Sequence, residues 1–442
     1  MKKILYLFVF LCSLSTIAQH SISGSFSPAE HYQWLLAYKM EPGGQNYVAD
    51  TRITNGQFTL NLPENSSSGT YRLVYAVPQE EFFFDVIYNG KEDISLRFST
   101  SEGLTFQSSS ENKLFASYFR DLQKQEQKII EFYASGNTNT DEFLNLIQQL
   151  SKTQETYENS SRGLLIHQFI LANKPYIPAA YESAEVYVKN KKGTYFNNLN
   201  LGDEELQASG FLVDKLSNYV FTALPMVLTD ALGTEQAIKD NIGLVHDELE
   251  GVATPFKLRL YNTLWSQASA AGLNETADYI YTSYLKEVAV AQGDLQLIQK
   301  IEVHNRLRLG ATAPDILWKA GEDLKKLSAL ENAENYVLAF WSSTCSHCLS
   351  ELPKLHSGIQ ENKTALVLAV GLEDGDQNWK KESAKLPNFE HAISLGKWES
   401  EYANLYAIQK TPTYYILDGK KKIIAKPEDY QEVLEFLKTR GN

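Results

Sequence analysis

Residues 340–353 read FWSSTCSHCLSELP, and they are the most informative part of the sequence for the fold of the last third of the chain. A β-rich run, Tyr336 to Trp341, leads into Cys345-x-x-Cys348, and a helix is predicted from about Cys348 to Glu361. Unpaired N–H groups and the macrodipole at a helix N-terminus stabilise a thiolate, the nucleophilic form of cysteine. The two-residue spacer lets the second thiol attack the first sulfur and resolve a mixed disulfide. The stretch therefore indicates dithiol redox chemistry.

His347 lies in the first turn of this predicted helix, where a cationic or hydrogen-bonding imidazole would favour the Cys345 thiolate. Two other uses of the cysteines stay open. A zinc site would need two more ligands, and no His/Cys cluster supplies them at a familiar spacing, so we expect no metal. A purely structural disulfide between Cys345 and Cys348 would need no further residue.

The chain has three cysteines, too few for a disulfide-stapled scaffold or a four-thiolate zinc site. Residues 1–18 are typical of a secretory signal, because Lys2 and Lys3 precede an apolar run that is short for a membrane span. Cys12 would leave with this signal at a cut before Gln19. An uncleaved anchor, which would hold the protein at a membrane, is the alternative. The mature chain is expected to be exported, without an integral membrane segment, and to keep two cysteines.

Length and composition limit the other possibilities. The 442 residues suggest two to four domains, and 43% hydrophobic residues are enough to bury real cores. The net charge of −13 argues against binding to nucleic acid. This acidity belongs to residues 1–305, which carry −12, whereas residues 306–442 carry −1.

The sequence pattern changes twice along the chain. Residues 19–107 alternate short apolar runs with turn signals, which predicts a small all-β sandwich with two-residue hairpin turns at Asn55-Gly56 and Asn89-Gly90. Residues 108–305 repeat apolar residues at three- and four-residue spacing, which predicts an all-α region. After a first helix that contains Leu114–Leu122, its helices are expected near 141–158, 161–173, 204–223, 234–249, 255–271 and 273–291.

Residues 306–442 alternate strand and helix patterns. The run TALVLAVGL at 364–372 is typical of a buried strand, and YYILD at 414–418 and KIIAK at 422–426 flank a predicted hairpin turn. The expected order from Tyr336 onward is β-α-β-α-β-α-β-β-α. This order predicts an α/β domain, in which a mixed sheet carries helices on both faces.

The last 130 residues resemble the thioredoxin superfamily, and within it the exported TlpA/ResA-like thiol–disulfide oxidoreductases. The resemblance spans about residues 308–440 and includes three stretches in order: GATAPDILW at 310–318, FWSSTCSHCLSELP at 340–353 and KTPTYYILDGKKKII at 410–424. A signal followed by a β domain, a helical region and this module also resembles multidomain oxidoreductases exported by Bacteroidota. That similarity implies a periplasmic location.

The resemblance implies a role for each residue of the site. Cys345 would be the attacking cysteine and Cys348 the resolving one. Thr411-Pro412 would form a cis peptide bond facing the dithiol, with Thr411 backbone groups able to pair with a substrate strand. Glu351 lies one helical turn after Cys348 and would exchange protons with it. No cofactor is expected beyond the two thiols.

Two departures from the family pattern leave the direction of electron flow open. Thr344 stands where the family has a tryptophan, and Ser346-His347 separates the cysteines where reductases often carry a proline. We expect a periplasmic reductase that acts on disulfide-bearing exported proteins and is recharged by a membrane thiol electron donor. A disulfide oxidase or isomerase that uses the same dithiol is the alternative. A periplasmic binding or adaptor protein with a structural disulfide is the alternative from a different class.

Overall fold

The computed structural model describes residues 20–226, 230–331, 333–360 and 365–440. They form two compact units, Met1–Gln292 and Gly293–Asn442, which we describe separately. The predicted signal at residues 1–18, with Cys12, lies outside the described residues. Within the described part of the chain, no helix combines the length and apolar character that a membrane crossing requires.

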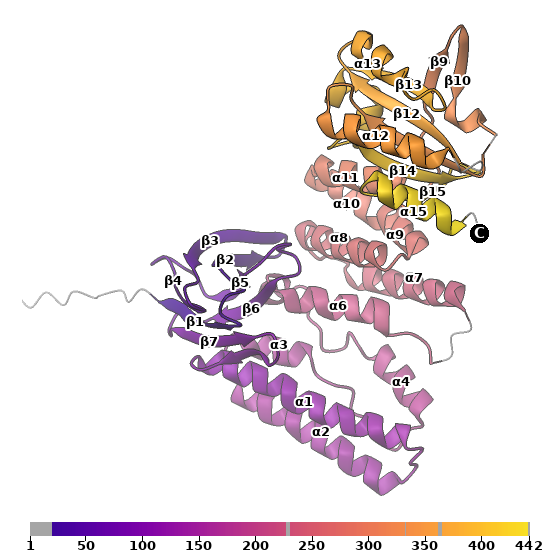
Figure 1. Cartoon of the computed structure of the whole chain (residues 1–442). Coiled ribbons are helices and arrows are strands. Elements are labelled where there is room, and N and C mark those ends of the chain that lie inside the picture. Colours follow the sequence, from indigo (N-terminus) through magenta and orange to yellow (C-terminus); the bar gives the residue numbers. More distant parts are fainter. Residues whose placement is uncertain (1–19, 227–229, 332, 361–364, 441–442) are drawn as a thin grey trace, which may run out of the picture. The chain divides into compact units, whose positions relative to one another are not determined.

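The N-terminal part of the first unit is a sandwich of two β-sheets (Figure 1, indigo). One sheet has the strand order β4-β1-β7-β8 and the other β3-β2-β5-β6. Apolar side chains from both sheets, such as Ile22, Leu35, Leu73 and Leu96, meet in one core. The strands are β1 (Ser21–Ser27), β2 (Trp34–Glu41), β3 (Gly44–Arg52), β4 (Gln57–Asn61), β5 (Gly69–Val74), β6 (Phe83–Tyr88), β7 (Ile94–Ser99) and β8 (Gly103–Phe106).

The two Asn-Gly turns connect the sheets instead of closing long hairpins. Asn55 and Gly56 both have positive φ, and Thr54 and Gln57 exchange two backbone hydrogen bonds across them. Beyond this turn, β3 pairs with β2 whereas β4 pairs with β1. The turn at Asn89-Gly90 likewise leads from β6 in one sheet to β7 in the other. The predicted turn at Asn55-Gly56 is confirmed, but the prediction that these turns close hairpins between paired strands is wrong.

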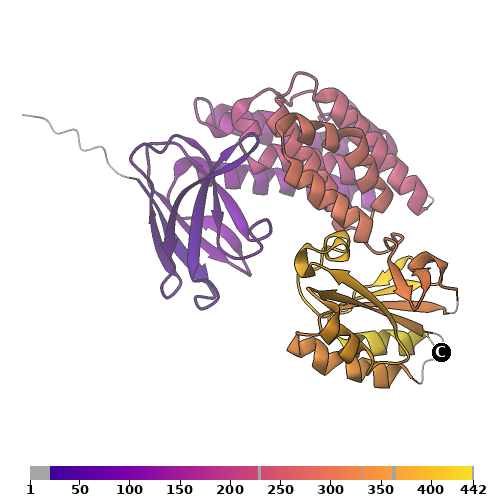
Figure 2. The same ribbon diagram turned by 90° about the horizontal axis from the view of Figure 1, so that it is seen from above.

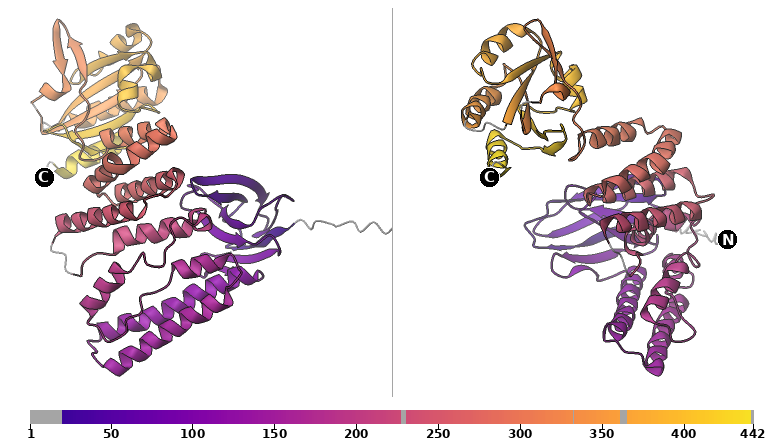
Figure 3. Two further views of the ribbon diagram at one scale, coloured as in Figure 1. Left: turned by 180° about the vertical axis from the view of Figure 1, so that it is seen from behind. Right: turned by 90° about the vertical axis from the view of Figure 1, so that its right-hand side faces the viewer.

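Helices make up the remainder of the first unit. The long helices α1 and α2 lie side by side (Figure 3), and α6 to α10 form successive packed layers. The helices are α1 (Ser110–Ala134), α2 (Thr140–Ser160), α3 (Ile166–Ala172), α4 (Ala184–Gly193), α5 (Glu204–Gln207), α6 (Gly210–Thr222), α7 (Ala231–Glu248), α8 (Thr254–Ala270), α9 (Asn274–Ile280) and α10 (Lys286–Gln292), with a π-helical turn η1 (Tyr281–Leu285) between the last two.

The sandwich and the helices are joined by buried polar contacts. Asn112, in the first turn of α1, donates to the Ile87 carbonyl and accepts from its N–H, so it acts as an added partner for β6. Arg259 of α8 donates to the carbonyl of Glu41, at the end of β2, and also to the carbonyls of Gln207 and Ser209 in the helical part. Buried polar groups need such partners, and these contacts fix the helices against the sandwich.

The second unit begins with a helix and continues as an α/β domain. Its five-stranded sheet has the order β13-β12-β11-β14-β15 and is seen from another side in Figure 2. A separate hairpin, β9 with β10, precedes the sheet. The elements are α11 (Leu295–Leu307), β9 (Leu317–Ala320), β10 (Asp323–Lys326), η2 (Leu327–Ala329), β11 (Asn335–Trp341), α12 (Ser346–Ile359), β12 (Ala365–Glu373), α13 (Asp376–Ser383), β13 (Glu390–Leu395), η3 (Lys397–Glu399), α14 (Glu401–Leu405), β14 (Thr413–Asp418), β15 (Ile423–Ala425) and α15 (Tyr430–Arg440).

The central strand β11 is buried along its whole length because both faces of the sheet are covered. Its alternate residues enter two different cores, as the period of two requires. Leu338 and Phe340 pack with α11, α14 and the β9–β10 hairpin, whereas Val337 and Ala339 pack with α12 and α15. The predicted order from β11 to α15 and the helices on both faces are confirmed.

Candidate active site

The dithiol lies where β11 ends and α12 begins. Cys345 is the N-cap of α12, and its Sγ accepts a hydrogen bond of 3.3 Å from the Cys348 N–H. The spacing thus places the first sulfur against the positive end of the helix and the second sulfur in its first turn. Both cysteines are free thiols.

The two thiols differ in exposure and in acidity. Cys345 is partly exposed, whereas Cys348 is completely buried. Partial burial alone would raise the pKa of Cys345, but its hydrogen bonds with Cys348, with Thr411 and with the His347 N–H together lower that pKa below its ordinary value. Burial and the Cys345 sulfur raise the pKa of Cys348 to about 12. Only Cys345 is therefore suited to attack as a thiolate near neutral pH.

The segment before β14 faces the first thiol. The Cys345 thiol donates to the Thr411 carbonyl oxygen at 3.4 Å, and the Thr411–Pro412 peptide bond is cis. The cis bond that the resemblance implied at this position is confirmed. Pro412 is buried while Thr411 is partly exposed, so the Thr411 backbone borders the more accessible sulfur.

Glu351 lies on α12 one turn beyond Cys348 and is partly buried. The Tyr414 hydroxyl, from β14, donates a hydrogen bond of 3.1 Å to Glu351 Oε2. Burial, together with the charges of Glu351 and Cys348, raises the pKa of Tyr414 far above its usual value. Tyr414 therefore stays protonated and acts only as a donor, next to both the carboxylate and the second thiol. Tyr414 was not among the site residues predicted from the sequence, although it lies only two residues after Pro412, in the strand that begins at Thr413.

His347 is exposed, and it contacts Cys345 through its backbone N–H. That contact comes from the start of the helix and would exist with another residue at this position. The imidazole faces solvent beside the dithiol.

The loop before Cys345 is held in place by a hydrogen bond to Glu373, which lies at the end of β12. Glu373 is 3% exposed, and its Oε1 accepts a hydrogen bond from the Ser343 N–H. The Ser342 hydroxyl lies 3.5 Å from the other carboxylate oxygen. Sequence reasoning missed this residue, and its one signal was a carboxylate at the end of an apolar run. Because β11 and β12 are parallel neighbours, their carboxyl ends meet at one edge of the sheet.

No group of three or more His, Cys, Asp or Glu side chains within the described residues is arranged to hold a metal ion. The chemistry that the site offers comes from the two thiols, the Glu351–Tyr414 pair and the Thr411 backbone.

Among known proteins, the chain matches solved structures. No protein-family model matches the chain, and no curated protein matches it. A domain of a "possible thiol-disulfide isomerase" from Cytophaga hutchinsonii is 31% identical, and the match covers 94% of that domain and 30% of this chain, with a TM-score of 0.28. The C-terminal part of this chain is therefore similar to thioredoxin-like thiol–disulfide oxidoreductases.

Two further solved structures are similar. The thioredoxin domain of a thiol-disulfide oxidoreductase from Bacteroides vulgatus is 21% identical, with 99% of that domain and 31% of this chain covered and a TM-score of 0.28. A thioredoxin-like protein from Bacteroides caccae is 17% identical, with 97% of that chain and 60% of this chain covered and a TM-score of 0.33. The multidomain fold class is that expected from the sequence: an N-terminal β region, a central helical region and a C-terminal thioredoxin-like domain.

Proposed function

We propose that this oxidoreductase is an exported, periplasmic disulfide reductase that acts on proteins in the same compartment. The observation that carries the proposal is the contrast between the two thiols. Cys345 is accessible and has a lowered pKa, whereas Cys348 is buried and has a raised pKa. A merely structural disulfide would not require this contrast.

In the first step, the Cys345 thiolate attacks one sulfur of a substrate disulfide. A bond forms between Cys345 Sγ and that sulfur, and the other substrate sulfur leaves as a thiolate that takes up a proton. The substrate segment would lie along the Thr411 backbone, whose carbonyl already contacts Cys345.

In the second step, Cys348 loses its proton and attacks Cys345 Sγ. The mixed disulfide breaks, the second substrate thiol is released, and the enzyme retains the Cys345–Cys348 disulfide. Two electrons have then passed to the substrate. Because the pKa of Cys348 is high, this step needs a proton acceptor, and Glu351 with Tyr414 is the polar pair beside it.

The oxidised enzyme must be reduced again before another turnover. A membrane protein that supplies electrons through its own thiols fits a site built from two cysteines. On this proposal residues 306–442 perform the reaction, and residues 19–107 and 108–305 bind partners. Export would depend on residues 1–18, where the sequence carries the pattern of a signal.

The lowered pKa of Cys345 favours one alternative, an oxidase or isomerase. Stabilising the reduced thiolate makes the corresponding disulfide a stronger oxidant. The same residues would then work in the opposite direction, with Cys345–Cys348 as the disulfide that is attacked.

The equilibrium reduction potential of the Cys345–Cys348 pair tests the proposal. The chain from Gln19 onward is equilibrated with glutathione and with dithiothreitol, and free thiols are trapped and counted. A value near or below that of thioredoxin, about −270 mV, supports the reductase, whereas a value near about −120 mV supports the oxidase. A pair that resists both reduction and trapping would overturn the enzymatic proposal. The Cys345→Ser/Cys348→Ser double variant is the control.

A further inference from the structure

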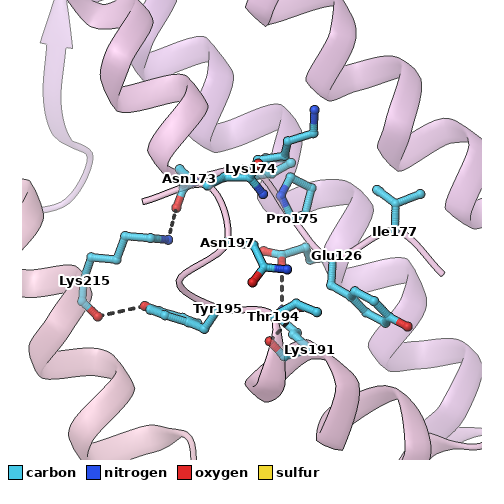
Figure 4. Close-up of a pocket in the computed structure, with 13 residues that line it drawn as sticks. Glu126, Asn173, Lys174, Pro175, Ile177, Lys191, Thr194, Tyr195, Asn197 and Lys215 are labelled. Atoms are coloured by element: carbon cyan, nitrogen blue, oxygen red, sulfur yellow. Dashed lines mark hydrogen bonds and ion pairs between the residues drawn. The ribbon is translucent and has the colours of Figure 1, made fainter. Parts of the chain in front are cut away.

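A cavity of about 460 Å³ lies in the helical part of the first unit, with no contribution from the dithiol domain. Figure 4 shows its walls, which come from α1, α4, α6 and the chain that follows α3 and α4. The volume is within the range of small-molecule sites, roughly 300–1,000 Å³. The polar residues central to the argument are Glu126, Asn173, Lys191, Tyr195 and Lys215.

Lys215 is a half-buried cation with a neutral partner. Its Nζ donates a hydrogen bond of 3.1 Å to Asn173 Oδ1 and lies 4.7 Å from the centre of the Tyr195 ring. The Asn173 amide is oriented by a second hydrogen bond, from its Nδ2 to the buried Tyr118 hydroxyl. Burial lowers the pKa of Lys215 to about 8, although the nearby Glu126 opposes this change. An ammonium group has three N–H donors, so Lys215 retains donors for a ligand.

Glu126, the acidic residue among those that line this cavity, is already paired with a cation. Lys191 pairs with Glu126 at 2.8 Å, and Lys174 pairs with Glu158 of α2 at 3.1 Å. Lys215 makes no such ion pair among the described residues; its partner is the amide of Asn173. The cavity therefore has a net excess of positive charge within a region of the chain that is otherwise acidic. An anion would supply the counter-charge that Lys215 lacks.

The rest of the wall fits an organic body attached to that anion. Leu122, Pro175 and Ile177 present apolar surface, and the exposed amides of Asn197 and Asn198 can both donate and accept. A bare inorganic anion would use neither the apolar wall nor the amide acceptors.

We propose that this cavity binds the carboxylate of an amino-acid-sized ligand, such as an N-acylated amino acid or the C-terminal residue of a peptide. Lys215 holds the carboxylate, the Asn197 and Asn198 amides meet the peptide-like group, and the apolar wall covers the side chain. This would give the helical region a ligand of its own, independent of the dithiol.

Calorimetric titration of the chain from Gln19 onward tests the site with four probes: N-acetyl-L-leucine, its neutral amide, a tripeptide ending in a free leucine carboxylate, and inorganic phosphate. We expect N-acetyl-L-leucine to bind. Its neutral amide should bind with an affinity that is lower by about tenfold or more. A tripeptide that binds more tightly than the free N-acyl amino acid identifies a peptide terminus as the source, and the reverse identifies a free metabolite. Equal binding of acid and amide, equal binding of phosphate, or no binding of either acid overturns the proposal.

Lys215→Met removes the charge but keeps an unbranched side chain of similar length, so affinity for N-acetyl-L-leucine should fall about tenfold or more. The exposed Lys113 of α1 lies outside the cavity, and Lys113→Met is the matched control. Unchanged affinity in Lys215→Met contradicts the assignment.

A second experiment uses the unaltered chain, so its result does not depend on whether a variant folds. N-acetyl-L-leucine, but not its amide, should protect Lys215 from acetylation, which mass spectrometry measures. Equal labelling with and without the acid would also contradict it.

Discussion

The Tyr414 hydroxyl donates a hydrogen bond to Glu351 across 63 residues of sequence, from β14 to α12, at 3.1 Å. This contact joins the strand that follows the cis-proline to the helix that carries the dithiol. It fixes the position of a carboxylate that would otherwise be free to rotate on the helix surface. If Glu351 takes the proton from Cys348, its position matters as much as its charge.

Tyr414→Phe should therefore slow the second step of the reaction more than the first. The variant keeps the ring and removes one hydrogen bond, so the free energy of unfolding should fall by only about 0.5–1.5 kcal/mol. Stopped-flow measurement of mixed-disulfide resolution should show a rate several times lower, with the rate of initial attack unchanged. Tyr415→Phe is the control, because its hydroxyl bonds the Tyr406 carbonyl on the opposite face of the same strand. Equal slowing in both variants would show that lost stability is the cause.

Glu351→Gln tests proton transfer directly. Glutamine keeps the size of the side chain and can still accept from Tyr414, but it cannot take up a proton near neutral pH. We expect slower resolution by Cys348 and a changed pH profile for that step, while alkylation of Cys345 keeps its own profile. Glu435→Gln, at an exposed position on α15, should leave both profiles unchanged. An unaltered resolution profile in Glu351→Gln would remove this residue from the mechanism.

Cys348→Ser should accumulate mixed disulfides between Cys345 and substrate proteins, because the attacking thiolate remains and the resolving thiol is absent. Non-reducing electrophoresis after export of the tagged variant should show adducts that dithiothreitol releases. Cys345→Ser is the matched control, and it should trap far less because its one remaining thiol is buried. Similar trapping by both variants would mean that the roles of the two cysteines are assigned wrongly.

The reactivity of the reduced protein should depend on pH in a way that separates the thiols. Because the pKa of Cys345 is lowered and that of Cys348 is about 12, iodoacetamide should label Cys345 first, below the pH at which an ordinary thiol reacts. The lowered pKa of Cys345 also determines how its contribution to the free energy of unfolding changes with pH. Folded Cys345 binds a proton less readily than unfolded Cys345, so its stabilisation is present above the unfolded pKa and is lost as pH falls through the folded pKa. Urea unfolding of reduced protein and Cys345→Ser at several pH values measures this difference.

The sequence predicted the α/β domain well because its signals are local. The strand β11, the Cys345–Cys348 spacing and the start of α12 lie within one continuous stretch, so periodicity and capping identify them together. The contacts that complete the site join distant residues. Glu351 meets Tyr414, and Glu373 meets Ser343, and neither pairing is visible until the strand order is known.

The first unit shows the same limit on a larger scale. The turn at Asn55-Gly56 was recognised from its dipeptide, but which strands pair afterwards depends on packing between sheets. The helix α4 was not predicted, because it is short, mostly polar and preceded by prolines that indicate a loop. The cavity around Lys215 could not be predicted either, since its walls come from three helices and two connecting segments.

Glu373 provides the last prediction, because it supports the redox loop from a neighbouring strand. Glu373→Ala should leave the buried Ser343 N–H without a partner, and stability should fall by about 1–3 kcal/mol. The loop before Cys345 should also lose its fixed position, so the pH profile of Cys345 alkylation should change. Glu373→Gln retains an acceptor and should restore both properties in large part. Asp374→Ala is the adjacent control, because that carboxylate is exposed and pairs with Lys397 at the surface. A loss of stability in Glu373→Ala with an unchanged Cys345 profile would limit Glu373 to holding the fold.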